Sequence, residues 1–148
     1  MVEPTDDDER TNSLGLFNTA DAYRLTAMAL PQIKHGHADK PLRFLYYHAL
    51  ELYLKAQLRQ KHNMTTVRDK FGHQIKLLMR EAETLGLVVG ENDRTVLTLI
   101  DDTDAMIDSR YIRTGTKQLA TLDSLRHTCN NIRRGVRSIL RNNGVMVR

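Results

Sequence analysis

Apolar residues recur at alternating intervals of three and four along most of this chain, and this spacing is the strongest constraint on its fold. The last segment keeps it without a break, and the residues that carry it are Leu122, Leu125, Cys129, Ile132, Val136 and Ile139. Side chains three and four positions apart share one face of an α-helix. Similar stretches begin near Leu16, Leu42, Ile75 and Val96, whereas no long stretch alternates like a β-strand. The sequence therefore predicts an all-α protein, an up-and-down bundle of about five helices.

Capping and breaking residues mark where these helices should begin and end. Asn18 or Thr19 is the expected cap of the first helix, and Thr121 that of the last. Gly86 follows the third apolar stripe and should end that helix. Gly135 interrupts the last helix, at a cost of about 1 kcal/mol relative to alanine.

Charge is distributed unevenly along the 148 residues. Residues 1–15 hold five acidic residues against one basic residue, a balance of −4, whereas residues 110–148 hold nine Lys and Arg against Asp123, a balance of +8. We therefore expect a flexible acidic tail over residues 1–14, followed by one helical domain over residues 15–144. The localised positive charge favours an anionic partner.

Several classes of protein do not fit the sequence. A single cysteine gives no internal disulfide framework, and no stretch approaches the roughly 18 apolar residues of a membrane span. The acidic N-terminus is unlike a secretion signal, so we expect a cytoplasmic protein that does not enter a membrane. We expect no cofactor and no metal, because phosphate-binding glycine loops and complete sets of metal ligands are both missing.

One apolar segment contains charged residues that its setting does not explain. Glu51 and Lys55 lie one helical turn apart in "YYHALELYLKA", and His48 precedes the glutamate by one turn. Such a pair stabilises an exposed helix by only about 0.2–0.5 kcal/mol, but this helix is apolar nearly all round and should be central. The three residues therefore form either a buried structural strut or part of a site.

A second group of residues is basic and lies near the C-terminus. Arginine forks suit phosphate oxygens, and a tyrosine ring can stack on a base, so the group is a candidate for binding nucleic acid or nucleotides. A solvated charged face is the alternative. The members are Arg110, Tyr111, Arg113 and Lys117 before the last helix, and Arg126, Arg133, Arg134, Arg137 and Arg141 on it.

Three segments follow one another within about residues 16–142, and they are "YYHALELYLKAQL", "FGHQIKLL" and "SRYIRTG". They resemble, in turn, the Glu-x-x-x-Lys helix, the Gly-His segment and the Arg-Tyr segment before the final helix of the HEPN (higher eukaryotes and prokaryotes nucleotide-binding) superfamily. The resemblance implies a helical bundle, commonly a homodimer. Many members are ribonuclease toxins paired with a nucleotidyltransferase-like antitoxin in prokaryotic stress or defence systems.

The family's ribonucleases use an arginine and a histidine about five residues later, at a dimer interface. Counting from Arg126 puts Asn131 at the histidine position, and an amide cannot act as a general base. We therefore expect a non-catalytic member that binds a nucleotide, RNA or a protein partner. The alternatives are a metal-independent ribonuclease using His127, or Arg68 with His73, and a purely structural dimerisation module.

On this interpretation, polar residues from several helices converge in one cluster. Lys55 and Arg110 would meet a phosphate or neutralise Glu51, and His73 and Tyr111 would supply hydrogen bonds or stacking.

Overall fold

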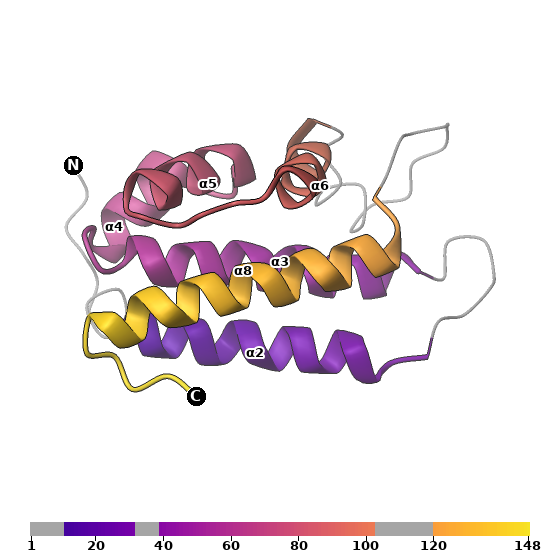
Figure 1. The fold of residues 1–148 in the computed structure, drawn as a ribbon, viewed down its shortest axis with the longest axis horizontal. Coiled ribbons are helices and arrows are strands. Elements are labelled where there is room, and N and C mark those ends of the chain that lie inside the picture. The colour runs from indigo at the N-terminus through magenta and orange to yellow at the C-terminus, as the bar shows by residue number, and fades with distance from the viewer. Residues whose placement is uncertain (1–10, 32–38, 103–119) are drawn as a thin grey trace.

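Helices make up all the regular secondary structure of the described residues, which are 11–31, 39–102 and 120–148 of this computed structural model (Figure 1). The prediction of an all-α bundle is confirmed. The helices are α2 (Ser13–Ala29), α3 (Lys40–Leu58), α4 (Met64–Thr66), the π-helix η1 (Val67–Phe71), α5 (Ile75–Thr84), α6 (Glu91–Asp102) and α8 (Leu122–Asn142).

Helix α3 occupies the centre of the fold, as its all-round apolar sequence predicts. It packs against α2, α8 and α5, while α6 bridges α5 and α8 (Figure 1). Tyr47, Leu50, Tyr53, Leu54 and Leu58 of α3 are all at most 2% exposed. Three polar residues of this helix, Glu51, Lys55 and Gln57, are buried with them.

The first helix begins earlier than predicted. Asn12, and not Asn18 or Thr19, is its N-cap, and the Asn12 side chain accepts a hydrogen bond of 2.8 Å from the backbone N–H of Gly15. Ser13 is already buried. Asn12 and Ser13 therefore belong to the folded helix although the tail prediction includes them, because the cap and the first core contact precede the visible apolar stripe. Residues 1–10 lie outside the described residues.

The packed chain also continues past the predicted domain end at residue 144. Helix α8 ends at Asn142, Gly144 adopts a positive φ of 86°, and the chain then turns back along the helix (Figure 1). Val147 is only 2% exposed, and Arg141 Nε donates a 3.0 Å hydrogen bond to its carbonyl oxygen. The burial of Val147 therefore extends the folded unit to Arg148.

Gly135 lies where α8 meets the loop after α5. A Cβ atom at this position would lie 2.7 Å from Cδ1 of Leu87, which is buried. Gly135 has a low helix propensity, but its missing side chain lets α8 approach the loop after α5 closely.

Candidate functional site

The structure brings four of the predicted polar residues together around Glu51, which is 1% exposed. His48 Nδ1 lies 3.2 Å from Oε2 of Glu51, Lys55 Nζ lies 3.6 Å from Oε1, and His73 Nδ1 is hydrogen-bonded to Oε1. We call these four residues the Glu51 cluster. His73 belongs to the turn before α5, so the carboxylate links that turn to the middle of α3. Arg110 and Tyr111 lie outside the described residues.

The ionisation of Glu51 reflects two opposing effects. Burial alone would raise the pKa of its carboxyl group, but the hydrogen bond from His48, the charge of Lys55 and the contact with His73 together hold the pKa below its ordinary value. Glu51 is therefore a buried carboxylate that its neighbours keep ionised. A group of this kind suits a structural strut.

Aromatic rings enclose the other side of the cluster. The ring of His48 stacks on Phe44 at 5.7 Å between centroids, and Tyr23 of α2 meets it edge-on at 4.5 Å. Of the four members, only His73 has a mostly exposed side chain, at 74%. The cluster offers little of its polar surface to a ligand.

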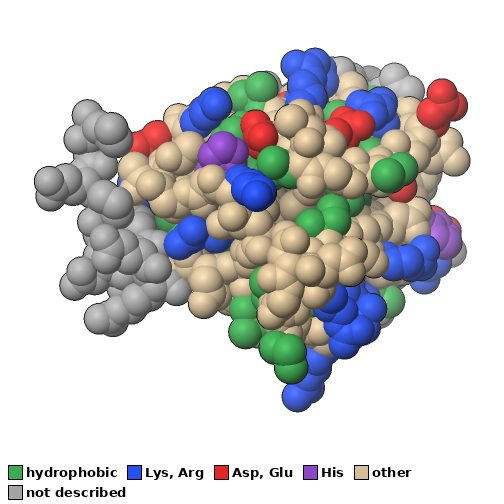
Figure 2. Space-filling view, turned by 60° about the vertical axis from the view of Figure 1, so that its left-hand side comes forward, with side chains coloured by type: hydrophobic (Ala, Val, Ile, Leu, Met, Phe, Trp, Pro, Cys, Tyr) green, Lys and Arg blue, Asp and Glu red, His purple; other side chains and the backbone are tan. Residues whose placement is uncertain are grey.

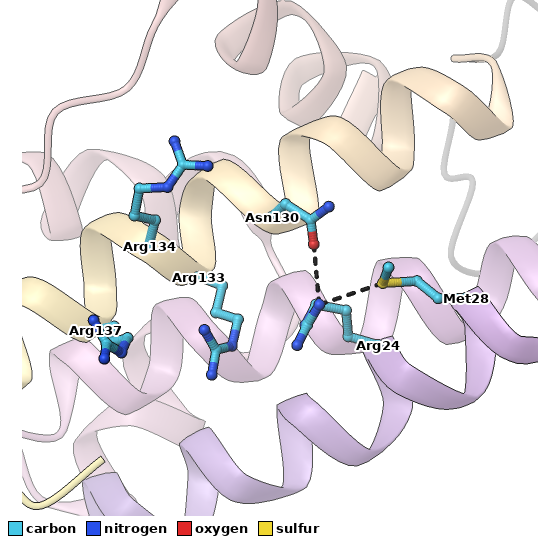
Figure 3. Close-up of a pocket in the computed structure, with 6 residues that line it drawn as sticks. All are labelled: Arg24, Met28, Asn130, Arg133, Arg134 and Arg137. Carbon is cyan, nitrogen blue, oxygen red and sulfur yellow. Dashed lines mark hydrogen bonds between the residues drawn. The ribbon is translucent and has the colours of Figure 1, made fainter. Parts of the chain in front are cut away.

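A ligand-sized hollow lies elsewhere among the described residues, between α2 and α8. Four arginines and two other residues line a hollow of about 430 Å³, which is within the usual range for small-ligand sites (Figure 3). We call it the arginine hollow. Its lining residues are Arg24, Met28, Asn130, Arg133, Arg134 and Arg137.

Hydrogen bonds fix the positions of two of these guanidinium groups. Arg133 Nε donates to Asp21 at 2.7 Å, and its guanidinium lies 5.2 Å from the centre of the Phe17 ring. Arg24 donates to the hydroxyl of Tyr53 at 3.0 Å and to the amide oxygen of Asn130 at 3.1 Å (Figure 3). Both side chains are therefore held in place before any ligand arrives.

The remaining two arginines are less constrained. Arg137 Nε donates to the backbone carbonyl of Arg148 at 2.9 Å, which leaves its other N–H groups available. Arg134 is exposed and has no hydrogen-bond or ion-pair partner among the described residues. Figure 3 shows it pointing from α8 away from the gap that holds Arg24 and Arg133.

The surroundings of the hollow are positive. Asp21 is the one described acidic residue in ion-pair contact with the four arginines, so four positive charges less one negative charge leave an excess of three. On the face shown in Figure 2 the acidic side chains lie in the upper half, whereas Lys and Arg are spread over both halves. This charge pattern favours an anion.

Three arginines of the basic group predicted near the C-terminus contribute to the hollow. Arg133, Arg134 and Arg137 line it, whereas Arg126 pairs with Asp123 at 3.4 Å on the surface. Arg113 and Lys117 lie outside the described residues. The sequence analysis missed Arg24 and Asp21, because their partners on α8 are more than 100 residues away and no local spacing signals the pairing.

The residues considered for ribonuclease chemistry lie in several parts of the fold, and two of them, His127 and Asn131, line a hollow between α6 and α8. The amide of Asn131 donates to Asp93 at 3.2 Å, and Arg68 pairs with its neighbour Asp69 at 3.2 Å, whereas His73 contacts Glu51. No group of three or more His, Cys, Asp or Glu side chains that could hold a metal occurs within residues 11–31, 39–102 and 120–148.

Comparisons of the chain with family models, curated proteins and solved structures find no match in any of the three. Within the described part of the chain, no helix is both long enough and apolar enough to span a membrane. The functional argument therefore depends on the site itself.

Proposed function

We propose that this protein is a non-catalytic helical domain that binds RNA or nucleotides through their phosphate groups, in the arginine hollow. The observation that carries the proposal is that four arginines from two helices line one cavity, with an excess of three positive charges. Guanidinium groups present N–H donors in a planar fork that matches phosphate oxygens.

Preorganisation supports specific binding over a diffuse charged surface. Arg24 and Arg133 are held by Tyr53, Asn130 and Asp21, so less side-chain entropy is lost when they meet a phosphate. Arg134 has no described partner to give up on binding.

The lining of the hollow favours binding over cleavage. Its six residues are arginine, methionine and asparagine, and none of these side chains can act as a general base near neutral pH. The ribonuclease alternative would need a histidine or a carboxylate as the base, and the nearby carboxylate of Asp21 is already bound by Arg133 and Tyr53.

Membership of the HEPN superfamily remains a prediction. The contact between Glu51 and His73 supports it, because it joins the Glu-x-x-x-Lys helix to the Gly-His segment. The homodimer, the nucleotidyltransferase-like antitoxin partner and the role in stress or defence are predictions that rest on the same resemblance.

Replacement of Arg134 tests the proposal, because this side chain makes no described contact that folding needs. We expect Arg134→Gln to weaken binding of a fluorescein-labelled ten-nucleotide single-stranded RNA about three- to tenfold, with an unchanged melting temperature. The slope of log K against log salt should fall in magnitude by about 0.7, the value for one phosphate contact on a single strand. Fluorescence anisotropy at several salt concentrations measures both quantities.

A matched control is Arg80→Gln, which removes an exposed arginine from α5, on the opposite side of α3 from α2 (Figure 1). It should leave binding unchanged. Competition by ATP against the labelled RNA distinguishes a nucleotide ligand from a polymer. Binding that is absent, that is insensitive to salt, or that Arg80→Gln weakens as much as Arg134→Gln would contradict the proposal.

A further inference from the structure

The face of α2 that is turned to solvent carries no charged side chain. The whole of α2 is described, and Asp21 and Arg24 are its only charged residues. Hydrogen bonds to α3 and α8 hold both of them on the inner side of the helix. The solvent-facing side of a helix normally carries charged and polar residues, so an uncharged one indicates contact with another molecule.

Apolar side chains occupy part of this face. Leu25 is 55% exposed and Met28 is 43% exposed, and Ala22 and Ala29 are exposed beside them. These four residues are spaced at intervals of three and four, so they share one side of the helix. We call them the α2 patch.

The α2 patch is continuous with the arginine hollow, because Met28 belongs to both. Met28 lines the hollow, and its sulfur accepts a 3.3 Å hydrogen bond from Nη1 of Arg24 (Figure 3). Leu25 lies less than one helical turn from Met28 on the same side of α2. A base is only one sugar away from its phosphate, so a nucleotide held at Arg24 could place its base on Met28 and Leu25.

Nucleobases match the α2 patch in size and in chemistry. The helix rises about 10 Å between Ala22 and Ala29, which is enough for about three bases stacked at about 3.4 Å. Proteins that bind single strands commonly combine a basic groove for the backbone with a surface on which the bases pack. In a duplex the base faces are enclosed, so a single strand is the form of RNA that offers them.

We infer that the α2 patch contacts the unpaired bases of a single strand whose phosphates lie in the arginine hollow. This inference rests on the proposed binding of RNA, and it names single-stranded RNA as the ligand. Leucine, methionine and alanine side chains offer no strong hydrogen bonds to base edges, so we expect little selection among the four bases.

The test uses the full chain and two labelled hexamers with the same number of phosphates, hexauridylate and an abasic ribose-phosphate hexamer. We expect hexauridylate to bind about three- to tenfold more tightly. Leu25→Asn should remove most of this difference and leave both the affinity for the abasic hexamer and the melting temperature unchanged. A ten-base-pair RNA duplex should bind the Leu25→Asn variant and the wild-type protein equally. Fluorescence anisotropy measures all these affinities.

A fluorescent residue reports the contact directly. The chain contains no tryptophan, so Leu25→Trp introduces a single indole ring into the α2 patch. We expect hexauridylate to quench its emission, because bases stack on aromatic rings, and the abasic hexamer to leave it unchanged. Val88→Trp is the matched control, since Val88 is 91% exposed in the loop between α5 and α6. Its emission should not respond to either hexamer.

Salt-dependent binding of both hexamers with equal affinity would refute the contact with bases and leave the proposed function standing. Weaker binding of the duplex to Leu25→Asn, or emission of Leu25→Trp that hexauridylate does not quench, would also refute it. Emission of Leu25→Trp that changes with protein concentration in the absence of RNA would show that a second copy of the chain covers the α2 patch instead. If neither hexamer binds, both proposals are wrong.

Discussion

Glu51 shows how one buried charge can be tolerated in an apolar helix. Its carboxylate is 1% exposed, and removing such a group from water is costly unless hydrogen bonds and opposite charges surround it. His48, Lys55 and His73 supply these contacts from one turn before it, one turn after it and the segment before α5. The pair that looks like weak helix support in the sequence is therefore a link between two segments.

We predict that Glu51 makes the protein sensitive to acid. The pKa of its carboxyl group is lower in the folded state than its ordinary value of 4.5. Its contribution to stability is therefore complete above about pH 4.5 and is lost as the pH falls through the folded-state pKa. Glu51→Gln should lower the free energy of unfolding at pH 7 by about 3 kcal/mol, because Lys55 loses its charged partner. It should also flatten the dependence of stability on pH below about pH 4.5.

Urea unfolding followed by circular dichroism at several pH values measures both effects. Glu83→Gln is the control, because Glu83 pairs with the exposed Arg94 on the surface. It should change the unfolding curve little and keep the acid slope. An acid slope in Glu51→Gln as steep as in the wild-type protein would show that other carboxyl groups cause it.

The sequence predicts contacts between residues that are close in the chain better than contacts between distant ones. His48, Glu51 and Lys55 meet because they are one turn apart, and helical spacing alone indicates this. His73 was expected beside them from the family resemblance. Arg24 and Asp21 were missed because their contacts with α8 depend on how two long helices pack, and neither residue breaks the pattern of its own helix.

At the level of elements, period and length decide what can be predicted. The five long helices have enough turns for their apolar stripes to be recognised, and all five are present where the chain is described. Helix α4 and η1 cover only three and five residues, so they show no such period. A cap depends on one residue and shows no period. The cap at Thr121 is confirmed, whereas α2 is capped by Asn12, which lies before the apolar stripe used for the prediction.

Gly135 provides a prediction about how α8 packs. Alanine should stabilise a helix by about 1 kcal/mol relative to glycine, but its Cβ atom would lie 2.7 Å from Leu87. Overpacking costs about 1–3 kcal/mol. We therefore expect Gly135→Ala to lower the free energy of unfolding by about 1 kcal/mol, as measured in denaturant.

A double-mutant cycle isolates the contact with Leu87. In a Leu87→Ala background the clash is removed, so the same Gly135→Ala change should raise stability by about 1 kcal/mol. Ser138→Ala, at an exposed position of α8, should show only the small effect of helix propensity. A stabilising effect of Gly135→Ala in the wild-type background would mean that the two segments separate easily.

At the level of the whole molecule, Asp21 ties the three long helices together. It belongs to α2, accepts hydrogen bonds from Tyr53 of α3 and from Arg133 of α8, and lies 3.8 Å from Arg24. Arg133 also donates to the carbonyl of Arg148, so the C-terminal segment is joined to the same network. Stability and the proposed binding of anions would therefore depend on the same arginine.

Because Arg133 both pairs with Asp21 and lines the arginine hollow, we predict that Asp21→Asn has opposite effects on stability and on binding. The amide would present N–H donors to the guanidinium of Arg133, so we expect the free energy of unfolding to fall by about 2 kcal/mol. Because a carboxylate and a phosphate compete for the same guanidinium groups, RNA should bind about two- to tenfold more tightly at low salt.

Asp69→Asn, which removes an exposed charge from η1, should change neither quantity. Chemical denaturation and fluorescence anisotropy on the same samples decide the matter. If both stability and affinity fall, Asp21 acts mainly by positioning Arg133, and the competition between carboxylate and phosphate is wrong.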